Sequence, residues 1–233
     1  MEAARPVWEG RVVDQSLTPE EDRRREQFLQ ATRKVVDAGI TLAAERGDGS
    51  FTVQELVGRA GISLHTFYRY FPSKDDLSLA IFEESMRIGT DYIAQRAASE
   101  RTPLERLRMT IVSPITTGFN HPRGLSPSYI VGEDLRLKRS HPKEVEAALV
   151  PYRHLIASAI TAAQDAGEFS GIDPMEDAEM IHHLMMTRYH LLAEGLLIGR
   201  TTTPADGLWD FCIGALRRRS GSTPPTKRTR SKT

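Results

Sequence analysis

The sequence contains a single cysteine, Cys212, among its 233 residues. One thiol excludes an intrachain disulfide framework and a zinc site built from several thiolates. No apolar run reaches the length of about 18 residues that a membrane-spanning helix needs. The stretch from Met1 to Leu17 also lacks the apolar core of a secretory signal. We therefore expect a cytoplasmic protein with no membrane partner.

The patterns that accompany catalysis are missing as well. The sequence has no nucleophile elbow, no glycine-rich phosphate loop and no paired-carboxylate motif. His182, His183 and His190 invite a metal site, but the last two are separated by about 10 Å along a helix axis. No pair of these histidines has the four-residue spacing of a helical metal site. We expect no enzymatic activity, no cofactor and no metal, and we expect Cys212 to be a small buried apolar residue.

Charge is balanced overall and divided unevenly along the chain. Lys plus Arg and Asp plus Glu number 31 each. Residues 1–74 hold eleven of each sign, residues 75–216 hold thirteen basic and twenty acidic side chains, and residues 217–233 hold seven basic and no acidic ones. A neutral total does not exclude a nucleic-acid partner, because binding depends on the local charge.

Apolar residues recur at helical spacing along most of the chain, and no useful length alternates as a strand would. The pattern predicts an all-α protein. A first helix should run from about Glu20 to Gly47, between a flexible N-terminal arm (1–20) and the next short helices. Later helices, punctuated by prolines, are expected at about 75–98, 103–119, 126–140, 143–166, 174–198 and 205–219. The Gly-, Ser-, Pro- and Arg-rich segment 220–233 should be a disordered basic tail.

Two short helices with strong local signals follow the first long one. Thr52 and Glu55 fit a capping box at the start of a helix that should end at Gly61. Ser63 can cap a second helix over Leu64–Tyr70. Two helices of about eight residues joined by a glycine turn predict a helix-turn-helix.

The second short helix has one apolar side and one polar side. At about 100° per residue, Phe67 and Phe71 face the preceding helix, whereas His65 and Arg69 face outward. Thr66 and Tyr68 flank the outward strip. Arginine can bond guanine edges in the major groove and hydroxyl groups can reach phosphates, so the strip suits a DNA recognition helix.

The segment Thr52–Leu77, TVQELVGRAGISLHTFYRYFPSKDDL, resembles the DNA-binding signature of the TetR family of bacterial transcriptional regulators. Close similarity extends over about residues 22–80. The resemblance implies a three-helix DNA-binding domain (21–74) followed by a helical ligand-binding and dimerisation domain (75–219). It also implies a homodimer on a double-stranded DNA operator and a small-molecule effector of unknown identity.

The resemblance further implies roles for individual side chains. Base contacts fall on Leu64, His65 and Arg69, and phosphate contacts fall on Thr66, Tyr68, Tyr70 and Lys74. The helix caps Thr52 and Ser63 complete the candidate DNA-binding residues. Two basic stretches, Arg23–Arg25 and the C-terminal tail, are further candidates for phosphate contact.

The resemblance assigns dimerisation to the last two long helices, which would form a four-helix bundle. Candidate interface residues are Leu184, Leu191, Leu192, Leu196, Trp209, Phe211, Ile213 and Leu216. A ligand pocket should lie among the middle helices, where the candidate lining residues are Met86, Tyr92, Met109, Val112, Ile115, Phe119, Tyr129, Tyr152, Ile156, Met185 and Tyr189.

The sequence thus favours a ligand-responsive one-component regulator, expected to act as a repressor. Two alternatives remain open. One is a DNA-binding regulator whose body serves only dimerisation or a protein partner, and the other is a helical enzyme with an incidental helix-turn-helix. A ligand that raises thermal stability would separate the ligand-responsive regulator from the regulator whose body serves only dimerisation or a protein partner.

Overall fold

A computed structural model describes residue 8 and residues 19–47, 49–116, 125–195 and 204–220. The side chains of residues 19–25 and 204 are outside this description. The described residues form nine helices and no strand, which confirms the all-α prediction. The helices are α2 (Pro19–Arg46), α3 (Val53–Ala60), α4 (Leu64–Tyr70), α5 (Lys74–Ala98), α6 (Pro103–Thr116), α7 (Pro127–Ser140), α8 (Pro142–Asp165), α9 (Pro174–Ala193) and α10 (Pro204–Ser220).

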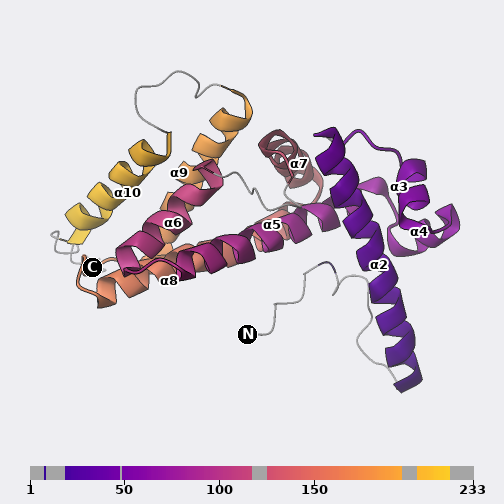
Figure 1. The fold of residues 1–233 in the computed structure, drawn as a ribbon, viewed down its shortest axis with the longest axis horizontal. Coiled ribbons are helices and arrows are strands. Elements are labelled where there is room, and N and C mark those ends of the chain that lie inside the picture. The colour runs from indigo at the N-terminus through magenta and orange to yellow at the C-terminus, as the bar shows by residue number, and fades with distance from the viewer. Residues whose placement is uncertain (1–7, 9–18, 48, 117–124, 196–203, 221–233) are drawn as a thin grey trace, which may run out of the picture.

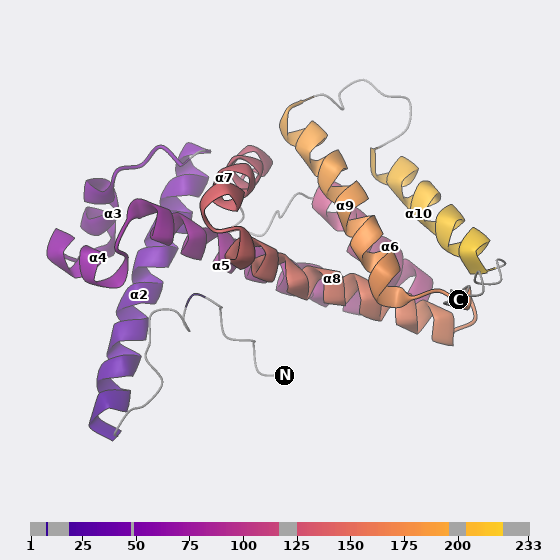
Figure 2. The same ribbon diagram turned by 180° about the vertical axis from the view of Figure 1, so that it is seen from behind.

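The molecule is elongated, with two groups of helices at its ends (Figures 1 and 2). Helices α2, α3 and α4 lie together at one end, and α6, α9 and α10 lie at the other. The long helices α5 and α8 run between the two groups, and α7 lies beside the junction. Helix α5 therefore connects the two groups of helices directly.

One apolar core unites α2, α3, α4 and the first turns of α5, and it continues into α7, the first half of α8 and Tyr189 of α9. It includes Val35, Leu56, Phe67, Leu77 and Ile81, each fully shielded from solvent. Helices α2 and α5 cross closely at Gly39, where an added Cβ would lie 2.4 Å from Cδ1 of Ile81. The first turns of α5 thus pack with the helix-turn-helix.

A second apolar core lies within the body, among α5, α6, α8, α9 and α10. Ile93, Leu107, Ile111, Ile156 and Ile160 are fully buried there. Cys212 belongs to this core and is 1% exposed, as expected for a small apolar residue. Its burial raises the pKa of the thiol to about 11.

The helix limits follow the expected proline and capping signals with small differences. Helix α9 ends at Ala193 rather than at 198, because Gly195 adopts φ 70 just beyond it. Helix α6 is described to Thr116, so the predicted residues 117–119 lie outside the described part.

Several expectations concern residues outside the described part. These are most of the arm, the tail beyond Ser220, the side chains of Arg23–Arg25, and the candidates Phe119 and Leu196. The arm contributes one described residue, Trp8, which is 1% exposed and joins the core around Phe67. Among the described helices, none has an apolar stretch long enough to cross a lipid bilayer.

Candidate functional site

Helix α3 begins and ends as its sequence predicts. The Thr52 hydroxyl accepts from the Glu55 amide at 3.2 Å, and the Glu55 carboxylate accepts from the Thr52 amide at 2.7 Å. Gly61 then adopts φ 67 and turns the chain toward α4, a left-handed conformation that glycine takes without a Cβ penalty. The predicted helix-turn-helix is therefore present.

Helix α4 buries one side and exposes the other. Phe67 is fully buried and Phe71 is 2% exposed, with their ring centroids 5.8 Å apart. Leu64 and Tyr68 are about half exposed, at 47% and 51%. His65 and Arg69 are exposed as well. Burial thus confirms the predicted orientation of this helix, while its contacts with DNA remain predictions.

The N-cap residues Thr52 and Ser63 have a clear local role. Ser63 accepts from the Thr66 amide at 3.0 Å and its hydroxyl lies 2.8 Å from that of Thr66. These bonds satisfy amides at the start of the short helix that would otherwise lack partners. The hydroxyls of both caps are occupied in shaping the motif.

Tyr70 packs in the core more than its predicted phosphate contact would suggest. Its side chain is 7% exposed, and its ring meets that of Phe28 edge to face with centroids 4.6 Å apart. The Arg69 guanidinium lies 5.4 Å from the Tyr70 ring centroid. Tyr70 therefore joins α4 to α2, and its ring contacts the guanidinium of the candidate base-reading arginine.

Lys74 connects the start of α5 to the loop before α3. Its Nζ donates to the carbonyl oxygens of Gly49 at 3.0 Å and Phe51 at 2.7 Å, and lies 4.8 Å from the Phe51 ring centroid. An ammonium has three donors, so one remains for the predicted phosphate contact. The structure adds a structural role that the sequence did not reveal.

Two exposed ion pairs join α2 to α3. Arg59 forms a two-pronged pair with Glu45 at 2.9 and 2.8 Å, and Arg46 pairs with Glu55. Hydrogen bonds from Thr52 and then from Arg46 lower the pKa of Glu55 to about 2. The capping carboxylate therefore stays ionised at neutral pH.

A small cavity of about 10 Å³ lies in the body among α5, α7, α8 and α9. Its volume is at the lower limit for one water molecule. Its walls are almost entirely apolar: Phe82, Met86, Thr90, Ile130, Ala148, Leu149, Tyr152, His182, Met185, Met186 and Tyr189.

Only part of the predicted pocket lies at this cavity. Met86, Tyr152, Met185 and Tyr189 line it. The structure places Tyr92, Met109, Val112, Ile115, Tyr129 and Ile156 elsewhere, since they are not among its lining residues. Val112, Ile115 and Ile156 pack in the body core, and Tyr129 packs in the core near the helix-turn-helix. His182 was missed, although it shares a helical face with Met185 and Tyr189.

Helix α7 joins the cavity region to the DNA-binding end. The Ser126 hydroxyl donates to the carbonyl of Gly47, at the end of α2, at 2.8 Å. Arg136 forms an ion pair with Asp75 in the first turn of α5. On the body side, the Ser128 hydroxyl donates to the Ala193 carbonyl of α9 at 3.1 Å.

The candidate dimer surface is reduced by the structure. Ile213 and Leu216 are 8% and 1% exposed within the single chain, because α10 packs that face onto the body core. Within the single chain, these two side chains therefore lie in the body core and not on the exposed surface of α10. Leu184, Leu191, Leu192 and Trp209 are half-buried, and Phe211 is 60% exposed.

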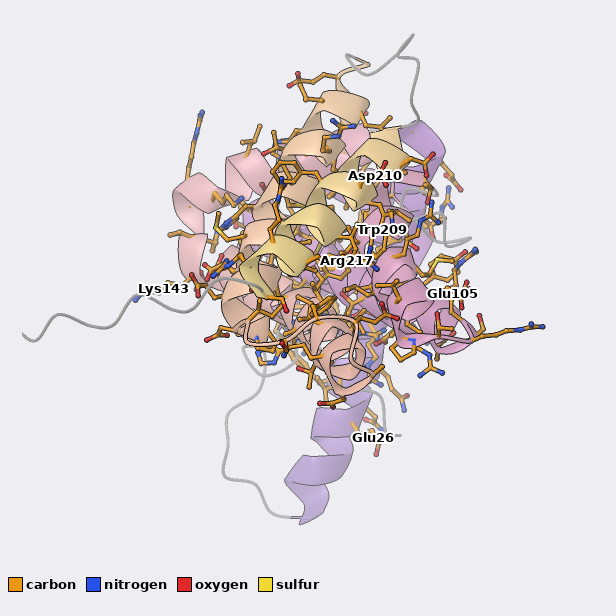
Figure 3. The ribbon with its side chains drawn as sticks, turned by 90° about the vertical axis from the view of Figure 1, so that its left-hand side faces the viewer. Glu26, Glu105, Lys143, Trp209, Asp210 and Arg217 are labelled. Carbon is orange, nitrogen blue, oxygen red and sulfur yellow. The ribbon has the colours of Figure 1, made fainter. Side chains whose placement is uncertain are left out.

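Met180, which the sequence reading missed, is 63% exposed on α9. Figure 3 views the molecule from this end, where α10 carries Trp209, Asp210 and Arg217 nearest the viewer. Large exposed apolar side chains thus remain on both α9 and α10, which form the outer layer of the body.

The three histidines do not form a metal site. His182 is buried at 3% exposure, His183 is exposed and His190 is half-buried, so they face different surroundings. No group of three or more His, Cys, Asp or Glu within the described ranges is arranged to hold a metal ion.

The family model described as "Bacterial regulatory proteins, tetR family" matches residues 35–81, from the middle of α2 into α5. The fatty acid metabolism regulator protein of Bacillus subtilis is 24% identical over 163 residues, which cover 68% of this chain and 79% of that protein. The transcriptional repressor KstR of Rhodococcus jostii is 32% identical over 98 residues, covering 42% of this chain and 44% of its own length.

The fold also matches a solved structure over most of both chains. The crystal structure of the transcriptional regulator FadR from Bacillus subtilis in complex with stearoyl-CoA has a TM-score of 0.56 and 18% identity, and the match covers 79% of this chain and 97% of that one. The matched family model and the capped helix-turn-helix with its outward polar strip lead to one conclusion: residues 35–81 are those of the TetR family of bacterial regulatory proteins, and the rest of the chain shares the fold of a transcriptional regulator.

Proposed function

We propose that the protein is a one-component repressor that binds a palindromic operator as a homodimer and releases it when a small, mostly apolar effector enters the body. The observation that carries this proposal is the course of α5. Its first residue, Lys74, holds the loop before α3, and its residues Phe82, Met86 and Thr90 form one wall of the cavity. A change at the cavity wall therefore moves an element that is fastened to the DNA-binding domain.

Helix α7 supports the same coupling by a second route. It contributes Ile130 to the cavity and contacts the DNA-binding end through Ser126 and Arg136. An effector that displaces α7 would act on Gly47 at the end of α2 and on Asp75 at the start of α5. Both routes lead to the elements that support α4.

The dimer is supported by the apolar side chains left exposed on the outer layer. Met180 on α9 and Phe211 on α10 are each more than half exposed. Apolar patches of this kind on soluble proteins commonly mark interaction surfaces. A two-fold pairing of α9 and α10 would cover them and would present two α4 helices to the two half-sites of a palindrome.

An apolar effector is supported by the lining of the cavity and agrees with the relatives. The FadR structure, whose fold is similar, was solved with stearoyl-CoA. For an effector to release DNA, it must bind the free dimer more tightly than the DNA-bound dimer. The two α4 helices have to move far enough that their separation no longer matches the fixed spacing of the two half-sites.

The decisive experiment starts with selection of genomic fragments bound by the purified full-length protein. Binding to the recovered operator is then measured for wild type, Arg69→Ala and Tyr68→Phe. We expect Arg69→Ala to lose discrimination at one position in each half-site, and Tyr68→Phe to weaken all sequences alike. Failure to recover any preferred sequence would contradict operator binding.

The two alternatives give different results in a ligand screen. A regulator whose body only dimerises or binds a protein would show operator binding and no thermal shift with any small molecule. A ligand with proven binding that leaves operator affinity unchanged would contradict release by that ligand. The relatives found are transcriptional regulators, which supports a regulator over a helical enzyme.

A further inference from the structure

The cavity contains one buried imidazole whose hydrogen-bonding groups have no protein partner. His182 is 3% exposed, and both of its ring nitrogens are shielded from solvent without a hydrogen bond from the described protein atoms. A buried polar group normally has a partner, because leaving it without one costs free energy. Leucine at this position would pack against the same apolar neighbours without that cost.

The neighbours of His182 supply packing and no hydrogen bond. The Tyr152 ring lies edge to face with the imidazole, with centroids 6.0 Å apart. The Tyr152 hydroxyl donates to the carbonyl oxygen of Thr110 at 2.6 Å, so its proton is committed elsewhere. Arg153, behind the cavity on α8, is paired with Glu146.

The cavity provides no ionic partner for a charged ligand group. None of the described residues lining it is Asp, Glu, Lys or Arg. Burial, and then the nearby Arg153 charge, lower the pKa of His182 to about 4, so its ring is neutral at physiological pH. A neutral imidazole offers one N–H donor and one acceptor nitrogen. Such a group matches a hydroxyl or carbonyl oxygen, whereas an ionised group would lose its hydration without a counter-charge.

The walls of the cavity are adaptable. Met86, Met185 and Met186 line it, and their unbranched side chains can take other rotamers at small cost. Ligand sites for small molecules usually measure about 300–1,000 Å³. Movement of these methionines is therefore the step that opens the present volume of about 10 Å³.

We propose that the effector is an uncharged, mostly apolar molecule and that its hydroxyl or carbonyl oxygen forms a hydrogen bond with the imidazole of His182. This inference rests on the proposed function, because it names the chemical class of the effector that enters this cavity. It makes His182 a specificity-determining residue.

The test uses four probes that share a benzene ring and a two-carbon chain: acetophenone, 1-phenylethanol, ethylbenzene and phenylacetate. Dissociation constants are measured by calorimetry and thermal shift on the full-length protein. We expect acetophenone and 1-phenylethanol to bind wild type about fivefold more tightly than ethylbenzene or phenylacetate, the difference that one net hydrogen bond of about 1 kcal/mol supports.

Three variants make the result specific. His182→Leu should bind acetophenone no better than ethylbenzene, and His182→Gln should keep part of the preference through its amide group. The matched control is His154→Leu, the same substitution at an exposed position of the adjacent helix α8. It should bind all four probes as wild type does. Circular dichroism and a melting curve establish that each variant is folded.

The possible outcomes test the role of His182 separately from the role of the cavity as the effector site. Equal affinity of wild type and His182→Leu for acetophenone overturns the inference and indicates that a structural water serves the imidazole. Preference for phenylacetate overturns it in favour of an ion pair. If none of the probes binds wild type or Met186→Ala, in which the cavity wall is shortened, the cavity is not the effector site and the proposed function fails at that step.

Discussion

The buried imidazole makes a quantitative prediction about stability and pH. Burial, assisted by Arg153, His183 and Lys138 and opposed by Glu146, lowers the pKa of His182 from 6.5 to about 4. Above pH 6.5 the ring is neutral in both the folded and the unfolded chain, so it contributes no pH dependence. Below pH 6.5 His182 becomes protonated in the unfolded chain but stays neutral in the folded chain until about pH 4. The free energy of unfolding therefore decreases as the pH is lowered from 6.5 and levels off below about pH 4.

The magnitude follows from the width of that window. Each unit of pKa shift corresponds to about 1.36 kcal/mol. At pH 5, about one and a half units below the unfolded value, His182 should therefore have removed about 2 kcal/mol of stability. The full loss near pH 4 is about 3 kcal/mol, a large part of the 5–15 kcal/mol typical of a folded domain.

The assay is urea unfolding at pH 8 and pH 5, followed by circular dichroism at one fixed protein concentration, since a dimer's stability depends on concentration. His182→Leu should be at least as stable as wild type at pH 8, because it removes unsatisfied buried nitrogens. Its advantage should grow by about 2 kcal/mol at pH 5. His154→Leu, at an exposed site, should follow the wild-type curve. Parallel curves for wild type and His182→Leu would refute the reasoning.

The other predictions concern DNA binding, dimer assembly and the Lys74 clamp, by which we mean the two hydrogen bonds from Lys74 to the carbonyl oxygens of Gly49 and Phe51. Arg69→Ala should leave the fold intact and weaken operator binding by about 1–3 kcal/mol in a binding titration. If the variant binds every single-base variant of the operator as wild type does, the prediction is contradicted. Lys74→Met should lower the free energy of unfolding in urea by about 1–2 kcal/mol, because two charge-assisted hydrogen bonds to loop carbonyls are lost at a half-buried site. If instead only the salt slope of DNA binding falls, by about one per subunit, Lys74 acts as a phosphate contact and not as a clamp. Phe211→Glu should reduce the mass measured by light scattering from about twice 26.1 kDa to that of one chain, and a wild-type mass of 26.1 kDa would contradict the dimer.

The helix-turn-helix could be predicted because its signals are local. The reciprocal bonds of Thr52 and Glu55, the left-handed Gly61 and the cap at Ser63 all act within a few residues, and each appears where the sequence placed it. The inward turn of Phe67 follows from its four-residue spacing to Phe71. Local chemistry and helical period were sufficient to orient α4.

The cavity could be predicted only in part, because it depends on how distant helices cross. Met86 on α5 and Tyr152 on α8 both line it. Ile156, one turn beyond Tyr152 on the same face, packs in the same body core as Tyr152 but does not line the cavity. The sequence shows which face of a helix is apolar but not which neighbour that face meets. The clamp of Lys74 is a similar case, since its partners Gly49 and Phe51 precede it by more than twenty residues.

The geometry of α5 sets what an effector must accomplish. From Thr90 at the cavity to Lys74 at the loop, the helix rises by about 24 Å at about 1.5 Å per residue. A tilt of about 5° about the cavity end therefore displaces Lys74 by about 2 Å, and in a dimer the two displacements act on a half-site spacing of about 34 Å. An apolar molecule that forces Met86 away from Met185 would push on α5 near its cavity end, so that a small movement there gives a larger movement at Lys74. Under the proposed function, the small volume of the cavity therefore couples entry of an effector, which displaces the methionine side chains, to movement of α5.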